Sequence, residues 1–118
     1  MKPTNTISHR AANALFKYTR FSESNTQVTI HKHDNHSTAE LRVHGSIIAT
    51  LDPYDGFLIT DSGWRSKLTR SRLNALPSVT LKGDTLTTSE FEIKDWDGEW
   101  TQIPYLGKDV LELQRAVR

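Results

Sequence analysis

The chain has 118 residues and a mass of 13.4 kDa, a length that fits one domain. Hydrophobic residues make up 36% of the composition and the net charge is only +1, which excludes a charge-driven disordered chain. The absence of cysteine excludes a disulfide framework and thiol chemistry, as expected for a reducing compartment. No apolar run approaches the roughly 18–20 residues of a membrane span, and no apolar signal segment follows Lys2. We therefore expect one cytoplasmic domain over residues 1–118, with a flexible arm at 1–7 and no membrane partner.

Charge is unevenly distributed along the chain. Residues 1–20 and residues 61–82 each carry a net charge of +4, whereas residues 83–107 carry −5. The basic blocks coincide with the first two predicted helices and the acidic block with predicted strands. A basic face fits phosphate or an acidic protein, but basic helices that neutralise neighbouring acidic strands explain the same pattern. The pI near 8.1 favours neutralisation, because dedicated nucleic-acid domains usually have a pI above about 9.

The first half of the chain predicts a helix followed by a run of strands. Apolar residues at helical spacing predict a helix over about 9–19, with Ser8 as its N-cap. Alternating residues predict strands from 26 onward. Gly45-Ser46 is either a tight turn or a glycine bulge in one long bent strand, and a shift of apolar parity slightly favours the bulge. The DPYDG segment at 52–56 predicts a hairpin loop.

The second half predicts a helix, a further group of strands and a closing helix. Ser66 or Thr69 is the expected N-cap of a helix that runs to Leu76 and ends before Pro77. Strands are expected at 79–81, 85–94 and 99–103, with a turn at 82–84, and a last helix is expected at 108–117. The predicted fold class is α+β. It is an antiparallel sheet of about five to six strands in two hairpin groups, with about three helices packed on one face.

Histidines gather at the end of the first predicted strand and just beyond it. His31 and His33 share one strand face, and His44 could join them from a paired strand to bind zinc or nickel. Their parity is opposite to that of Val28 and Ile30, so solvated surface histidines are the simpler interpretation. No nucleophile-and-base pair or glycine-rich phosphate loop accompanies them, so we expect no cofactor. An enzyme, metal-dependent or acid–base, is therefore the least favoured class.

The most distinctive stretch runs from Ser62 to Leu76 and combines a tryptophan with four cations. A cationic cluster near a helix N-terminus is suited to gripping an anion, and tryptophan with arginine is typical of binding hot spots. Equally, the tryptophan could belong to the core and the arginines could pair with acidic strands. The candidate binding residues are Trp64, Arg65, Lys67, Arg70 and Arg72.

Three segments carry a further pattern: HGSIIA at 44–49, GWRSKLTRSRLN at 63–74 and GEW at 98–100, which match the form HGxxIA, GWxS, TxxRLN and GxW. Together they resemble a family of small uncharacterised tailed-phage accessory proteins. The resemblance covers roughly residues 38–103 and departs from the family at Leu68, where many members have threonine. It implies a phage origin and the host cytoplasm, and it implies no activity.

The function expected from these features is a non-catalytic binding module. Small phage proteins commonly bind and inhibit or redirect a host or defence factor in host takeover, so a host or phage protein is the expected partner. The first alternative is a nucleic-acid binder that adds Arg10, Lys17 and Arg20 of the first helix to the cluster. The second alternative is a histidine-based enzyme at His31, His33 and His44. A homodimer through an exposed sheet edge stays open.

Overall fold

The computed structural model describes residues 6–104, so the predicted helix at 108–117 and most of the predicted arm lie outside the described residues. The helices are α1 (Ile7–Phe16) and α2 (Lys67–Asn74). The strands are β1 (Phe21–Glu23), β2 (Thr26–Lys32), β3 (Ser37–Val43), β4 (Ser46–Asp52), β5 (Gly56–Ile59), β6 (Thr80–Lys82), β7 (Thr85–Thr87), β8 (Glu92–Ile93) and β9 (Thr101–Gln102).

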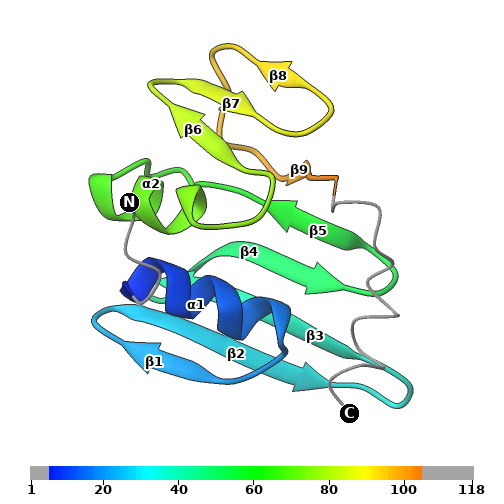
Figure 1. Ribbon diagram of the computed structural model, residues 1–118. Coiled ribbons are helices and arrows are strands. Elements are labelled where there is room, and N and C mark those ends of the chain that lie inside the picture. The colour runs from blue at the N-terminus through cyan, green and yellow to red at the C-terminus, as the bar shows by residue number, and fades with distance from the viewer. Residues whose placement is uncertain (1–5, 105–118) are drawn as a thin grey trace.

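The strands form two antiparallel sheets rather than one. Six strands make the main sheet in the order β1-β2-β3-β4-β5-β9, and β6-β7-β8 make a small second sheet (Figure 1). The expected second hairpin group therefore splits, because β9 leaves its sequence neighbours and pairs with β5, with Thr101 opposite Ile59. The α+β class is confirmed, with two helices in the described part of the chain.

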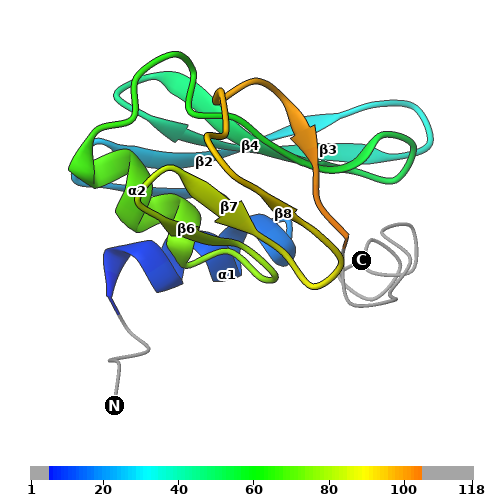
Figure 2. The same cartoon turned by 90° about the horizontal axis from the view of Figure 1, so that it is seen from above.

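One face of the main sheet is covered and the other is open. Seen from above, α1, α2 and the small sheet all lie on the same side of the main sheet (Figure 2). Strand alternation explains this arrangement, since Val28, Leu41, Leu51 and Ile59 all point to the covered side and are buried. We call the opposite side, which no described element covers, the open face.

Both described helices begin at a hydroxyl cap. Thr6 is the N-cap of α1, and its Oγ1 accepts from the backbone N–H of His9. The predicted cap, Ser8, instead lies inside the first turn and is buried. At α2 the N-cap is Ser66, whose Oγ accepts from the backbone N–H of Thr69. Ser66 was one of the two N-caps expected from the sequence. No helix in the range 6–104 is long and apolar enough to cross a membrane.

The preference for one long bent strand across Gly45 was wrong. β3 and β4 are separate strands joined by a tight turn in which His44 and Gly45 both have positive φ, 51° and 81°. The parity shift has another cause, a bulge inside the β3–β4 pair. Leu41 lies opposite Ala49 and Arg42 opposite Ile47, which leaves Ile48 as the extra residue.

Candidate functional site

A tight turn after β5 fixes the start of the basic stretch. The backbone N–H of Trp64 donates to the carbonyl of Asp61 at 3.0 Å, and the N–H of Gly63 donates to the Asp61 carboxylate at 2.8 Å. Ser62 and Gly63 both have positive φ, and the Ser62 hydroxyl donates to the carbonyl of Ile47. These bonds anchor the turn to β4 on one side, so its backbone is held before any partner arrives.

Arg65 ties this turn to the segment around the small sheet. Its Nε donates to Asp61 at 3.1 Å, its Nη1 to Asp84 at 3.1 Å and its Nη2 to the carbonyl of Trp96 at 2.6 Å. The guanidinium carbon also lies 4.8 Å from the centroid of the Trp96 ring. All three nitrogens of Arg65 are therefore engaged within the molecule, and its position favours a structural role.

Arg70 has side-chain partners within the molecule, whereas Lys67 has none among residues 6–104. Arg70 donates to the carbonyl of Gly83 and lies 3.6 Å from the carboxylate of Asp84. Lys67 is the first residue of α2, is exposed, and has no side-chain partner among residues 6–104. A cation at a helix N-terminus opposes the helix dipole, so Lys67 gains no stability from its position.

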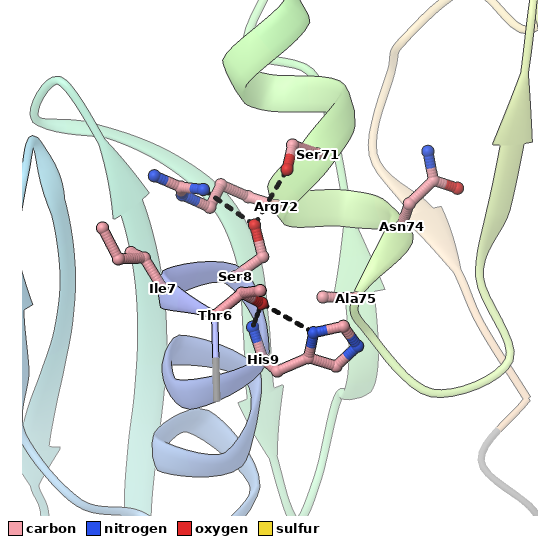
Figure 3. Close-up of a pocket in the computed structure, with 8 residues that line it drawn as sticks. All are labelled: Thr6, Ile7, Ser8, His9, Ser71, Arg72, Asn74 and Ala75. Carbon is pink, nitrogen blue, oxygen red and sulfur yellow. Dashed lines mark hydrogen bonds between the residues drawn. The ribbon is translucent and has the colours of Figure 1, made fainter. Parts of the chain in front are cut away.

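Arg72 is buried, with only 7% of its surface exposed. Its Nε donates to the hydroxyl of Thr26 at 2.8 Å and its Nη1 to the hydroxyl of Ser8 at 2.7 Å, while Ser71 contacts the same Ser8 oxygen (Figure 3). The guanidinium thus joins α2 to α1 and β2, and burial lowers the pKa of Arg72. Arg72 is in the predicted binding cluster, but its guanidinium bonds inward and no longer supports a surface contact.

Trp64 is the member of the cluster that faces solvent most fully, with 67% of its surface exposed. Its ring stacks on that of His44 from the β3–β4 turn, with centroids 6.1 Å apart and an angle of 17° between the rings. We call Trp64, His44 and Lys67, which follows Trp64 by three residues, the tryptophan surface. Sequence reasoning placed His44 with the other histidines and missed its contact with Trp64.

The three candidate metal ligands do not come together. His31 Nε2 lies 2.8 Å from Glu40 Oε1, and His33 Nε2 lies 3.2 Å from the hydroxyl of Thr38. His44 sits in a turn at the other end of β3 and stacks on Trp64. In the described part of the chain, no group of three histidine or carboxylate side chains could hold a metal ion. The arrangement therefore gives no support to the alternative of one metal site shared by His31, His33 and His44, which was the less favoured interpretation of the sequence.

The open face brings together a different set of polar residues, in a groove of about 530 Å³ that spans β2, β3 and β4. Glu40 lies at its centre, and its Oε1 contacts His31 Nε2, Arg42 Nη2 and the Thr29 hydroxyl. Burial raises the pKa of Glu40, but the hydrogen bonds and charges of Arg42 and His31 outweigh it and lower the pKa overall. Glu40 is therefore held as a carboxylate.

A second carboxylate, Asp52, closes one end of this groove. It accepts from the Thr38 hydroxyl at 2.6 Å and from the backbone N–H groups of Tyr54 and Asp55. Burial raises the pKa of Asp52, but these hydrogen bonds lower it further than burial raises it. His36 Nε2 lies 3.6 Å from Asp52, and the His36 ring stacks on His33 with centroids 4.4 Å apart.

These features define a small α+β protein with an exposed aromatic pair at one edge and a polar groove on an open sheet face. The chain belongs to the Kyanoviridae Gp96 protein family, whose model matches residues 4–112. This is a phage protein family of unknown activity, in agreement with the resemblance noted in the sequence. No curated protein and no solved structure matches the chain.

Proposed function

We propose that this phage protein is a binding module whose contact surface is the tryptophan surface, and that its partner is a host or phage protein. The observation that carries this proposal is Trp64, a large side chain that is two-thirds exposed on a turn with a fixed backbone. Tryptophan is enriched among the residues that dominate binding energies, and a preorganised turn lowers the entropy lost on association.

The turn that carries His44 also supports a binding role. His44 has positive φ before glycine, a position in which asparagine is the favoured residue of a hairpin turn. The imidazole that takes this place stacks on Trp64 and enlarges the exposed aromatic surface.

The charges near Trp64 favour a protein over a nucleic acid. Arg65 and Arg72 are engaged inside the molecule, and Arg70 shares the carboxylate of Asp84. Within the cluster that follows Trp64, a phosphate backbone would therefore meet Lys67 as the one cation without a partner among residues 6–104, whereas nucleic-acid binding usually draws on several. One lysine beside an exposed aromatic pair fits an acidic residue at the edge of an apolar protein patch.

The test is a pull-down from bacterial lysate with the tagged chain, split into nuclease-treated and untreated halves. We expect a discrete protein that survives nuclease treatment and is lost with Trp64→Ala. Trp100→Ala is the matched control, because Trp100 is also exposed, at 49%, but lies outside the tryptophan surface. A partner that disappears after nuclease treatment would favour the nucleic-acid alternative, and equal capture by Trp64→Ala would contradict the proposed surface.

A further inference from the structure

The open face carries an arrangement of acid, base and cation that the tryptophan surface does not use. His31 on β2 and the pair Glu40 and Arg42 on β3 point to this face, because strand residues two apart share a side. His33 extends past the end of β2 and reaches Thr38, two residues before Glu40. No described element covers the groove that these side chains line (Figure 2).

Glu40 is held in a way that leaves one oxygen free. Three donors converge on Oε1, while Oε2 has no hydrogen bond among the described residues. A carboxylate fixed at one oxygen presents the other in a defined direction, where it can take a proton from a bound hydroxyl.

A proton donor lies on the other side of Thr38. His33 Nε2 is 3.2 Å from the Thr38 hydroxyl, and Thr38 and Glu40 are two residues apart on one strand face, about 6–7 Å. A phosphate seated over the Thr38 side chain would lie between Glu40 and His33. An in-line displacement needs this arrangement, because the entering and leaving oxygens occupy opposite sides of the phosphorus atom. Arg42 lies beside Glu40 and retains N–H groups, since each terminal nitrogen has two and uses one here.

We propose that the groove cleaves RNA by acid–base transesterification, with Glu40 as the base, His33 as the acid, and Arg42 and His31 as the groups that contact the phosphoryl oxygens. This activity is separate from the proposed protein binding and rests on different residues.

The reaction balances without a co-reactant. Glu40 Oε2 takes the proton of the ribose 2′-hydroxyl, and the 2′-oxygen forms a bond to phosphorus. The bond from phosphorus to the 5′-oxygen breaks, and imidazolium His33 gives its proton to that oxygen. The products are a 2′,3′-cyclic phosphate and a free 5′-hydroxyl. Positive groups that meet the phosphoryl oxygens stabilise the charge of the transition state.

The carboxylates of the groove differ in how strongly they would repel a bound phosphate. Glu40 is compensated by Arg42 and His31, and Asp52 by a hydroxyl and two amides, which leaves Asp55 as the exposed negative charge at the rim. DNA lacks the 2′-hydroxyl that the reaction consumes, so it must be inert in this site.

The test uses the full chain and a fluorogenic DNA oligonucleotide that contains a single ribonucleotide, with the all-DNA oligonucleotide beside it. We expect cleavage of the first substrate only, with a 2′,3′-cyclic phosphate product identified by mass spectrometry. Glu40→Gln and His33→Asn should each lower kcat/KM by about 100-fold or more. His9→Asn should leave the rate unchanged, because His9 lies in α1 on the covered side of the main sheet and outside the groove.

Three results would overturn the proposal: no cleavage by the wild-type chain, cleavage of the all-DNA oligonucleotide, or unchanged cleavage by the Glu40→Gln/His33→Asn double variant. Circular dichroism verifies that each variant is folded, and His33→Asn provides the decisive measurement if Glu40→Gln fails to fold. The pull-down separates this proposal from the binding function, because Trp64→Ala should cleave normally and Glu40→Gln should capture the partner normally.

Discussion

The two faces of the main sheet use arginine in opposite ways. On the covered face, Arg72 is buried and bonds to the hydroxyls of Ser8 and Thr26. On the open face, Arg42 reaches solvent and pairs with Glu40 at 2.8 Å. The guanidinium group therefore links elements of the fold in the buried Arg72, and it is a charge accessible to solvent in Arg42. Residue type alone does not show whether an arginine has a structural role or is available at the surface, because this depends on its burial.

The strongest way to test this contrast is to remove both arginines separately. Arg72→Ala removes two charge-assisted hydrogen bonds and leaves the buried Thr26 hydroxyl without its donor, which we expect to cost about 3–4 kcal/mol of unfolding free energy. Arg42→Ala on the open face should cost about 1 kcal/mol or less. Urea denaturation measures both, and equal losses would contradict the assignment of Arg72 to structure. Should Arg72→Ala not fold, Arg72→Met keeps the side-chain volume and still removes the bonds.

A second variant tests how the small sheet is joined to the main one. Gly98 has a φ of +81°, and a Cβ at this position would overlap the carboxylate of Asp61. Gly98→Ala should therefore lower the unfolding free energy by about 3 kcal/mol, from backbone strain and overpacking together. Gly45→Ala is a suitable control, since Gly45 also has a φ of +81° but a Cβ there would meet nothing within 4 Å. If both variants lose the same stability, then the contact with Asp61 contributes nothing beyond strain.

Acid should lower the stability that the open-face carboxylates Glu40 and Asp52 contribute to the fold. The folded state lowers the pKa of Glu40 and of Asp52, so the unfolded chain binds more protons than the folded chain as the carboxyl groups titrate. This contribution to stability is complete above the ordinary carboxyl pKa of about 4 and is lost as the pH falls through the lower folded values. The urea concentration at the unfolding midpoint should therefore decrease as the pH is lowered from 5 to 3.

Thr38→Val sharpens this prediction, because it removes the hydroxyl that Asp52 accepts from. The variant should have a flatter acid response than the wild type, although its midpoint at pH 7 is lower. An unchanged slope would show that other carboxyl groups carry the pH dependence.

The smallest expected effect on stability belongs to the tryptophan surface. His44→Asn places the favoured residue in the turn and removes the ring that stacks on Trp64, so the two effects should cancel to within about 0.5 kcal/mol. Partner capture should nevertheless weaken. A variant that binds the partner as well as the wild type would show that the histidine ring contributes nothing to the contact.

The sequence predicted local structure well where one signal was sufficient. Alternation located β2, β3, β4 and β5, and Ser66 was one of two caps expected for α2. β1 was not predicted, and the single strand expected at 85–94 is two short strands, β7 and β8. The separation into two sheets was missed because pairing of β9 with β5 depends on contacts between residues more than forty positions apart. Periodicity carries no information on such distant pairing.

The candidate sites were harder to predict because burial is a tertiary property. Arg65 and Arg72 are indistinguishable from Lys67 in a sequence, yet the fold engages the first two internally and leaves the lysine free. Glu40 and Arg42 did carry a usable signal. They alternate with the buried residues of β3 and therefore had to share the face of His31.

The bulge in the β3–β4 pair has a consequence for how this chain tolerates changes in length. Ile48 is the residue of β4 without a partner in β3, so its deletion would restore a regular ladder with β3 and leave the other side chains of the strand on their present faces. The cost would be the buried Ile48 side chain and the hydrogen bond that its carbonyl accepts from the backbone N–H of Thr60. Loss of any neighbour within the ladder would instead exchange inward and outward side chains along part of the strand. When sequences of this family are aligned, a one-residue gap in this strand should fall at Ile48.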